Sequence, residues 1–393
     1  MEKITFVIPS RNNLEFLQLA YKSIRNLNTR HEILVLNDAS TDGTQEWIDS
    51  LNDDDLITHH NPGPERIGIV GMFDKGIEMA RTKIIFAFHS DMVAAPDLDK
   101  HILKHLKKGT VVSATRVEPP LHPDGPEKIL YDFGIEVEDF DYDKFCDWVT
   151  KPVDSEGGYQ PKHDTLVTEG IFAPWCMYKE DFLAVGGHDE LFAPQSREDS
   201  DLFNRFILKG YKVLQTWEGL VYHFTSRGSR FNKHAGGAAG QDSEEWKYTN
   251  VKNMRNFIRK WGTGVKHDDF LKPIVSSKYD IGFIIKNGNS NILAGLEPWC
   301  NTIYIEPSLI KSYIETEQPN TTINLSERIK PYDNEKENYI LVTIDANNFS
   351  ASDYRVIEQL SDIITDSGEL GEFELENLNI EIFNLKTYEK ELI

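Results

Sequence analysis

The segment at residues 84–92, IIFAFHSDM, most constrains what this chain can fold into. Its apolar start and abrupt polar end are typical of a short strand that is buried on both faces. In open parallel sheets, ligands bind beyond the carboxyl ends of the strands, so His89, Ser90 and Asp91 form a candidate site. The alternative is that Asp91 only caps the helix predicted after Pro96.

Two earlier apolar segments, residues 4–8 and 32–36, also lead into polar stretches. An amphipathic helix between them, with Asn13 as its predicted N-cap, completes a βαβ unit and makes the strands parallel. The residues that follow these two strands include Pro9, Ser10, Asn12, Asn37 and Asp38. Because three strands in succession end this way at one edge of one sheet, we predict a nucleotide site at that edge.

Composition narrows the class of protein. A length of 393 residues allows about two or three domains. The net charge of −22 argues against a broad attraction to nucleic acid or to anionic membranes. The three cysteines are widely spaced and form neither a zinc pattern nor a disulfide framework, so a reducing cytoplasm is expected. No apolar run approaches the roughly 20 residues of a membrane span, and the strand that begins at once after Met1 leaves no room for a signal peptide.

A second group of motifs lies at residues 169–205. It contains the turn GGHDE at 186–190 and then EDSDLFNR at 198–205, where Glu198 and Asp199 open a predicted helix. Acidic residues suit a helix N-terminus, so a purely structural role is the alternative for this pair. Asp201 and Arg205 have the spacing of an i,i+4 ion pair.

These motifs together resemble family 2 glycosyltransferases over about residues 3–263. The segments that carry the resemblance are VIPSRN at 7–12, LNDASTDGT at 36–44, the acidic strand end at 89–91, GGHDE at 186–190 and EDSDL at 198–202. The resemblance implies an α/β protein of the GT-A fold, with a Rossmann-like, mostly parallel sheet flanked by helices. It also implies an enzyme that moves a sugar from a nucleoside diphosphate donor to a hydroxyl acceptor with inversion.

The resemblance assigns roles at the donor site. The first loop is expected to line the base or ribose, and Asp38, with Asn37 as a second candidate, to hydrogen-bond the base. Arg66 is either a diphosphate ligand or a solvated surface arginine. The implied donor residues are Pro9, Ser10, Asn12, Asn37, Asp38, Arg66 and Ser90. UDP is favoured because it is the commonest nucleotide in the family, and GDP and dTDP stay open.

A metal site is implied as well, with one departure from the family pattern. The family's D-x-D motif holds a divalent cation against the diphosphate, but His89 replaces the first acid here and only Asp91 remains. In many relatives a histidine at the place of His223 completes the site, although a lone histidine is more often structural. Imidazole suits Mn²⁺ better than Mg²⁺, so we expect Mn²⁺, with Mg²⁺ as the alternative.

On the acceptor side, Asp199 matches the family's general base, which takes the proton of the acceptor hydroxyl as its oxygen attacks C1. Glu198 is expected to orient the acceptor or to raise the pKa of the base by like-charge proximity. Trp175 either stacks on a sugar of the acceptor or belongs to the core. The basic, glycine-rich residues 225–237 are expected to form a lid over the diphosphate, or an ordinary solvated loop.

Two other functions are weighed against this one. A non-catalytic protein that binds sugar nucleotides or glycans is the first alternative, because the first acid of D-x-D is missing. A nucleotidyltransferase is less favoured, since it would need a glycine-rich loop and a lysine directly after the first strand. A glycan, a protein side chain and a modified nucleobase all stay open as acceptor. A nucleic-acid acceptor is not favoured, because the basic helix around residues 247–260 is more simply a solvated face.

The domain organisation is predicted in two parts. Residues 1–264 form the catalytic domain, with a donor half at 1–115 and an acceptor half at 116–264. The aromatic-rich residues 118–165 are expected to be an ordered insertion on the acceptor side. Residues 271–393 form a second, smaller α/β domain without a catalytic motif. Its default role is interaction or homo-oligomerisation, and a diverged nucleotide-binding fold is the alternative.

Overall fold

The computed structural model describes residues 2–152 and 155–393, and the chain divides into two compact units. The N-terminal unit contains Met1–Thr249 and His267–Pro273, and the C-terminal unit contains Asn250–Lys266 and Ile274–Ile393. The division falls inside one long helix, α8 (Glu244–Trp261). The reason is that Arg259 in the second half of this helix pairs with Glu297 of the C-terminal unit.

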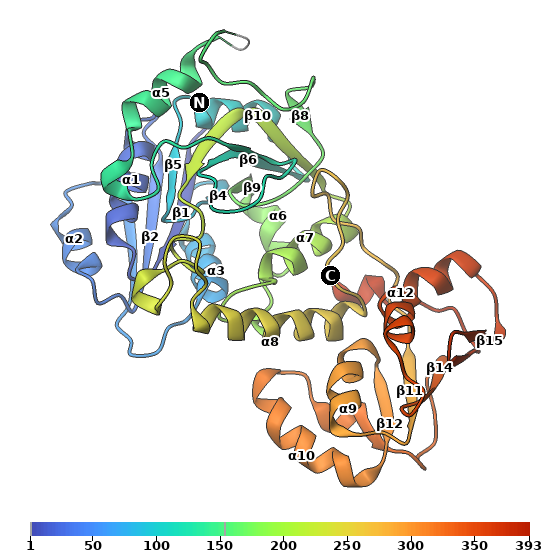
Figure 1. Cartoon of the computed structure of the whole chain (residues 1–393). Helices are drawn as coiled ribbons and strands as arrows, with labels where there is room; N and C mark the ends of the chain where they lie inside the picture. The colour runs from blue at the N-terminus through green and yellow to red at the C-terminus, as the bar shows by residue number, and fades with distance from the viewer. Residues whose placement is uncertain (1, 153–154) are drawn as a thin grey trace. The chain divides into compact units, whose positions relative to one another are not determined.

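A ten-stranded mixed sheet forms the middle of the N-terminal unit, in the order β3-β2-β1-β4-β9-β6-β10-β5, with β7 beside β6 and β8 beside β10 (Figure 1). The first four strands are parallel, and β9 runs antiparallel between β4 and β6. The strands are β1 (Ile4–Ser10), β2 (Glu32–Asp38), β3 (Leu56–Asn61), β4 (Ile84–Ala87), β5 (Met92–Ala94), β6 (Thr110–Glu118), β7 (Lys128–Leu130), β8 (Val167–Thr168), β9 (Trp175–Tyr178) and β10 (Lys212–His223). One sheet thus crosses the expected donor and acceptor halves without a break at residue 115.

Helices cover both faces of this sheet, because its strands alternate apolar side chains between two cores. Phe6 of β1 packs with α1 and α4 on one face, while Val7 packs with α3, α6 and α7 on the other. The helices are α1 (Leu14–Arg25), α2 (Thr44–Ser50), α3 (Ile69–Met79), α4 (Leu98–His105), α5 (Tyr142–Thr150), α6 (Lys179–Leu183) and α7 (Glu198–Leu208). This layered arrangement confirms the predicted fold class.

The aromatic-rich insertion is ordered in its described part. Phe133 and Phe145 form a separate core with Tyr222 of β10, and their rings meet in edge-on contacts. The hydroxyl of Tyr222 donates to the backbone oxygen of Gly134 at 2.6 Å. Residues 153 and 154 of this insertion lie outside the described residues.

The C-terminal unit has its own six-stranded sheet, in the order β13-β12-β11-β14-β16-β15, which confirms a second α/β region. Four strands are parallel, and the last two strands form a hairpin that turns at Glu376 and Asn377. Its strands are β11 (Ile281–Lys286), β12 (Thr302–Ile305), β13 (Ile329–Pro331), β14 (Ile340–Asp345), β15 (Gly371–Leu375) and β16 (Leu378–Ile382). Its helices are α9 (Ser290–Leu296), α10 (Pro307–Glu317), α11 (Leu325–Arg328) and α12 (Ala351–Ser367), besides the second half of α8.

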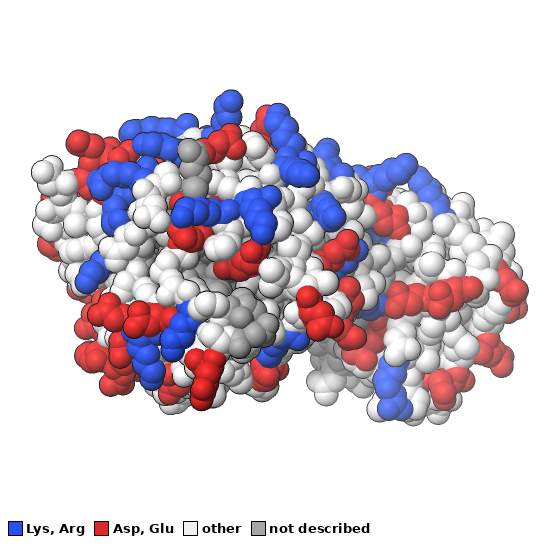
Figure 2. Space-filling view, turned by 90° about the horizontal axis from the view of Figure 1, so that it is seen from above, with Lys and Arg blue, Asp and Glu red and all other residues white. Residues whose placement is uncertain are grey.

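The surface carries charged side chains of both signs. On the face drawn in Figure 2, lysine and arginine side chains are interspersed with aspartate and glutamate. Within the described residues, every helix is too short or too polar to cross a membrane.

Candidate functional site

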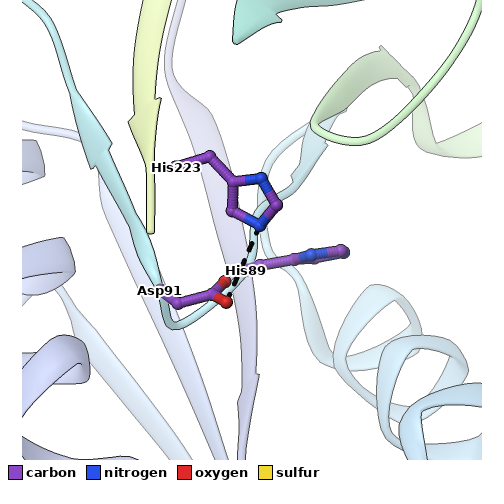
Figure 3. A group of neighbouring side chains, drawn as sticks. All are labelled: His89, Asp91 and His223. Atoms are coloured by element: carbon purple, nitrogen blue, oxygen red, sulfur yellow. Dashed lines mark ion pairs between the residues drawn. The ribbon is translucent and has the colours of Figure 1, made fainter. Parts of the chain in front are cut away.

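A histidine, an aspartate and a second histidine meet at the carboxyl edge of the N-terminal sheet. His89 and Asp91 lie in the turn between β4 and β5, and His223 is the last residue of β10. One ligand atom from each of the three lies within 4.8 Å of the others. Figure 3 shows the ring of His223 directed at the carboxylate of Asp91, with Nε2 and Oδ2 3.7 Å apart.

Strand register explains why these residues meet. The end of β10 pairs antiparallel with β5, which places His223 opposite Met92, the neighbour of Asp91. The backbone nitrogen of Phe224 then donates to the backbone oxygen of Asp91 at 3.0 Å. Along β10 the pairing with β6 shifts between Thr216 and Leu220, so β10 is one continuous strand with a bulge at this point. Asp91 does not cap α4, whose N-cap residue is Asp97.

The turn after β10 fixes the carboxylate of Asp91. Thr225 and Ser226 both have positive φ angles, of 64° and 57°. This turn directs the next two backbone N–H groups at Asp91, whose Oδ2 accepts from Arg227 at 2.6 Å and from Gly228 at 3.3 Å. Such hydrogen bonds favour the ionised form of a carboxyl group.

Glu118 fixes the orientation of His223, and sequence reasoning missed it. Because β6 runs beside β10, the last residue of β6 lies against His223, and Glu118 Oε1 is 2.7 Å from His223 Nδ1. Lys128 and Arg116 hold the same carboxylate, at 3.0 Å and 3.4 Å. An imidazole that gives Nδ1–H to a carboxylate presents Nε2 to a metal. The signal in the sequence was a buried strand ending in Glu, which alone is weak.

Burial and charge set the protonation states of these groups. Burial lowers the pKa of His89 to about 4, although the carboxylates of Asp91 and Asp199 act in the opposite direction. Burial would also lower the pKa of His223, but Asp91 and Glu118 outweigh it and raise that pKa to about 9. Burial alone would raise the pKa of the Asp91 carboxyl, yet His223 holds it well below its usual range.

These donor atoms fit a divalent cation. Two imidazoles and one carboxylate form a mixed nitrogen and oxygen set, which suits Mn²⁺ and other transition metals better than Mg²⁺. The carboxylate of Glu118 behind His223 is the outer partner that such sites usually have.

Glu198 and Asp199 begin α7 after a strained turn. Ser196 and Arg197 have φ angles of 77° and 69°, in the left-handed region that non-glycine residues rarely adopt. Asp199 is exposed, and its negative charge raises the pKa of His89 against the effect of burial. Asp199 therefore lies within electrostatic reach of the cluster of His89, Asp91 and His223. Glu198 is half-buried, and burial together with the charge of Asp199 raises its pKa to about 8.

The donor-type residues line the same edge but are held in different ways. Asp38 accepts from the backbone nitrogens of Ile67 and Gly68, each at 2.8 Å, so it orders the loop that carries Arg66. Asn12 accepts from the backbone nitrogen of Thr41, which ties the first loop to the second. Pro9 is half-buried at the end of β1, and the buried amide of Asn37 donates to Gln45 at 2.9 Å.

Two single side chains have surroundings that bear on their predicted roles. Asn13 is the N-cap residue of α1, but its side chain makes no capping hydrogen bond and donates instead to Ser90 Oγ at 3.0 Å. Asp42 accepts from the first helical nitrogen in its place. Trp175 is only 3% exposed and packs against Phe182 in the core of the sheet, so its position does not support acceptor binding. Its indole belongs to the apolar strand β9.

A cavity of about 410 Å³ opens beside this edge. It lies between the start of α1 and residues 227–234, and Asn13 and Arg227 connect its lining to the site through Ser90 and Asp91. Its lining comprises Asn12, Asn13, Leu14, Glu15, Phe16, Asp42, Arg227, Phe231, Asn232, Lys233 and His234.

Residues 5–141 match the family model described as Glycosyl transferase family 2. The match lies within the N-terminal unit and confirms the sequence resemblance over that range, while residues 142–393 lie outside it. Among curated proteins, the chain is similar to an undecaprenyl-phosphate mannosyltransferase of Micrococcus luteus, with 23% identity over 120 residues. The aligned part is 30% of this chain and 49% of that relative, so the chain spans about half the length of the curated relative it matches.

Two solved structures are similar at low identity. One is GalNAc-T7 with UDP, GalNAc and Mn²⁺, at 15% identity and a TM-score of 0.42, covering 57% of this chain and 43% of that one. The other is the mannosyltransferase PcManGT from Pyrobaculum calidifontis in complex with GDP-Man and Mn²⁺, at 15% identity and a TM-score of 0.40, covering 65% and 62%. Neither similarity assigns a substrate to this chain.

Proposed function

We propose that this chain is a metal-dependent, inverting glycosyltransferase that moves a sugar from a nucleoside diphosphate sugar to a hydroxyl acceptor. The observation that carries the proposal is the cluster of His89, Asp91 and His223 at the sheet edge, with Asp199 within electrostatic reach. This cluster lies in the unit that contains the family 2 segment. UDP is the favoured nucleotide, and Mn²⁺ is the favoured ion because two ligands are imidazoles.

The three clustered side chains would hold the ion, which when bound neutralises charge on the leaving diphosphate. Asp199 acts as general base: its carboxylate takes the proton of the acceptor hydroxyl while that oxygen bonds to C1 of the sugar. The bond between C1 and the diphosphate oxygen breaks on the opposite face, and the nucleoside diphosphate leaves. Glu198, protonated at neutral pH because its pKa is about 8, can donate a hydrogen bond that orients the acceptor.

The first test measures nucleotide binding by calorimetric titration of UDP, GDP and dTDP, with and without Mn²⁺. We expect one nucleotide to bind in a metal-dependent way, and Asp91→Asn to weaken that binding by about tenfold or more. Asp91→Asn preserves the shape of the side chain and can still accept from Arg227 and Gly228, so loss of binding reports on the metal. If no nucleotide binds the wild type under any metal condition, the proposal is wrong.

The second test separates an enzyme from a binding protein. With the nucleotide identified, its sugar conjugates are incubated with the protein, and release of the free nucleoside diphosphate is followed. Asp199→Asn should retain the affinity for the nucleotide and lower turnover by about a hundredfold or more, because the proton acceptor is lost. Equal turnover in this variant would remove Asp199 from the role of base.

A further inference from the structure

Glu245, near the start of α8, lies between two arginines of the donor edge. Its Oε1 is 2.5 Å from Nη2 of Arg66, and its Oε2 is 3.8 Å from Nη1 of Arg11. Arg11 follows β1, and Arg66 precedes α3, so the two come from different loops. A single carboxylate therefore neutralises two guanidinium groups, and all three residues belong to the N-terminal unit.

Both arginines adjoin groups of the expected nucleotide site. Arg11 follows Ser10, a residue that is only 4% exposed. The hydroxyl of Ser10 has no hydrogen-bond partner within the described residues. The Nε of Arg11 is also buried without a partner there. Arg66 precedes Ile67, whose backbone nitrogen is bound by Asp38. Two buried polar groups at this edge thus lack a hydrogen-bond partner among the described residues, as expected of a site that binds an additional polar ligand.

Glu245 is near the end of the segment of residues 225–246, which contacts the sheet edge at several points. Near its start, the backbone nitrogen of Arg227 donates to Asp91. In its middle, Asn232 Nδ2 donates to the backbone oxygen of Arg11 at 3.2 Å. Near its end, Arg230 pairs with Asp242, only three residues before Glu245. The segment therefore contacts Asp91, then Arg11 in the loop after β1, and then Arg66.

We infer that Arg11 and Arg66 form a binding site for the phosphates of the nucleotide, and that Glu245 occupies this site as an internal anion until the nucleotide displaces it. This inference rests on the proposed function. A diphosphate carries more charge and more acceptor oxygens than a carboxylate, and guanidinium groups bind phosphate in bidentate fashion, so the nucleotide can replace Glu245. Smaller anions of single charge compete with Glu245 less well.

The test compares Glu245→Gln with the wild type in the full chain. Removing the internal anion should tighten binding of the nucleoside diphosphate by about threefold to tenfold, the size expected from one or two partly exposed ion pairs. Affinity for the matching nucleoside, which lacks phosphate, should not change. Glu244→Gln is the matched control, because Glu244 is the exposed neighbour and pairs with Lys247 at 2.7 Å. Calorimetry with Mn²⁺ present throughout gives the affinity of each of the three proteins for both ligands.

Inorganic pyrophosphate separates failure of this inference from failure of the proposed function. Its affinity should also rise in Glu245→Gln, whether or not any nucleotide binds. If nucleotide binds the wild type but neither it nor pyrophosphate binds Glu245→Gln more tightly, the inference is wrong and the proposed function stands. If pyrophosphate binding tightens while no nucleotide binds either protein, the arginine site is supported and the proposed function fails. Weaker nucleotide binding by Glu245→Gln would instead make Glu245 a residue that positions the arginines, which also overturns the inference.

Discussion

Single residues at the site act mainly by holding others in place. Asp91 is fixed by two backbone N–H groups, and His223 is fixed by Glu118. The replacement of an acid by His89 leaves a neutral imidazole, because burial keeps the pKa of His89 at about 4. In a metal site, a neutral nitrogen ligand would supply one negative charge fewer than a carboxylate, and Glu118 would offset this by making His223 a better ligand.

The contact between Glu118 and His223 can be tested with Glu118→Gln. The variant should bind Mn²⁺ about tenfold to a hundredfold more weakly, because His223 loses the carboxylate that orients it. Electron paramagnetic resonance of free Mn²⁺ measures the affinity without any need for activity. Glu127→Gln is the control, since Glu127 pairs with Arg116 at 2.9 Å in the same network and, within the described residues, forms no hydrogen bond or ion pair with His223. Equal Mn²⁺ affinities in the two variants would contradict the assigned role.

At the scale of elements, α3 connects the two sides of the site. Its start lies at the loop bound by Asp38, and the nitrogen of Ile69 donates to the backbone oxygen of Pro194 at 2.8 Å. Asp74 in its middle binds the ring of His188 at 2.6 Å, in the GGHDE turn that precedes α7. A shift of α3 on the sheet would therefore move both the donor loop and the segment that leads to Asp199.

The packing of α3 can be tested at Gly76, where an added Cβ would lie 2.5 Å from Val7 and 2.8 Å from Leu36. Gly76→Ala should destabilise the N-terminal unit by about 1–3 kcal/mol, because the side chains of Val7 and Leu36 in the sheet would have to move. Gly295→Ala in α9 is the control, since nothing lies within 4 Å of its added Cβ. That variant should be more stable by about 0.5–1 kcal/mol, the helix-propensity difference. Denaturant unfolding gives both values, and a stabilising Gly76→Ala would show that α3 does not pack this closely.

At the scale of the whole molecule, α8 belongs to both units. In its second half Arg259 is fully buried and binds Glu297, which is also fully buried, with Nη2 and Oε2 2.6 Å apart. Arg328 and Tyr313 bind the same carboxylate. The C-terminal unit therefore needs the second half of α8 to satisfy a buried charge, which is why the division between units falls inside the helix.

Arg259→Leu should accordingly destabilise the C-terminal unit by about 3–5 kcal/mol, because it leaves Glu297 buried beside one fewer positive charge. Arg355→Leu on α12 is the control, and it should change stability by less than about 0.5 kcal/mol because Arg355 is exposed and, among the described residues, donates only to Ser352. Calorimetry of thermal unfolding measures the change in stability of each variant. Equal stability of the two variants would mean that the buried pair contributes nothing net to this unit.

The sequence by itself determined the strands, the parallel βαβ units and the edge where polar residues gather, because hydrophobic periodicity and chain chirality are local rules. It also placed His89, Asp91 and His223 together, although only through a resemblance to a family. The roles of the donor and acceptor residues stay predictions. Only the tertiary structure decided that Trp175 is a core residue and that Asn13 binds Ser90 and does not cap its helix.

The tertiary structure alone also brought in Glu118, which lies behind His223, and Glu245, which lies between Arg11 and Arg66. The same holds for the division of the chain inside α8. The physical reason is common to all three. Each depends on which charged side chains meet across 38 or more residues of chain. Strand register and long-range packing set those contacts, and no local pattern of residues encodes them.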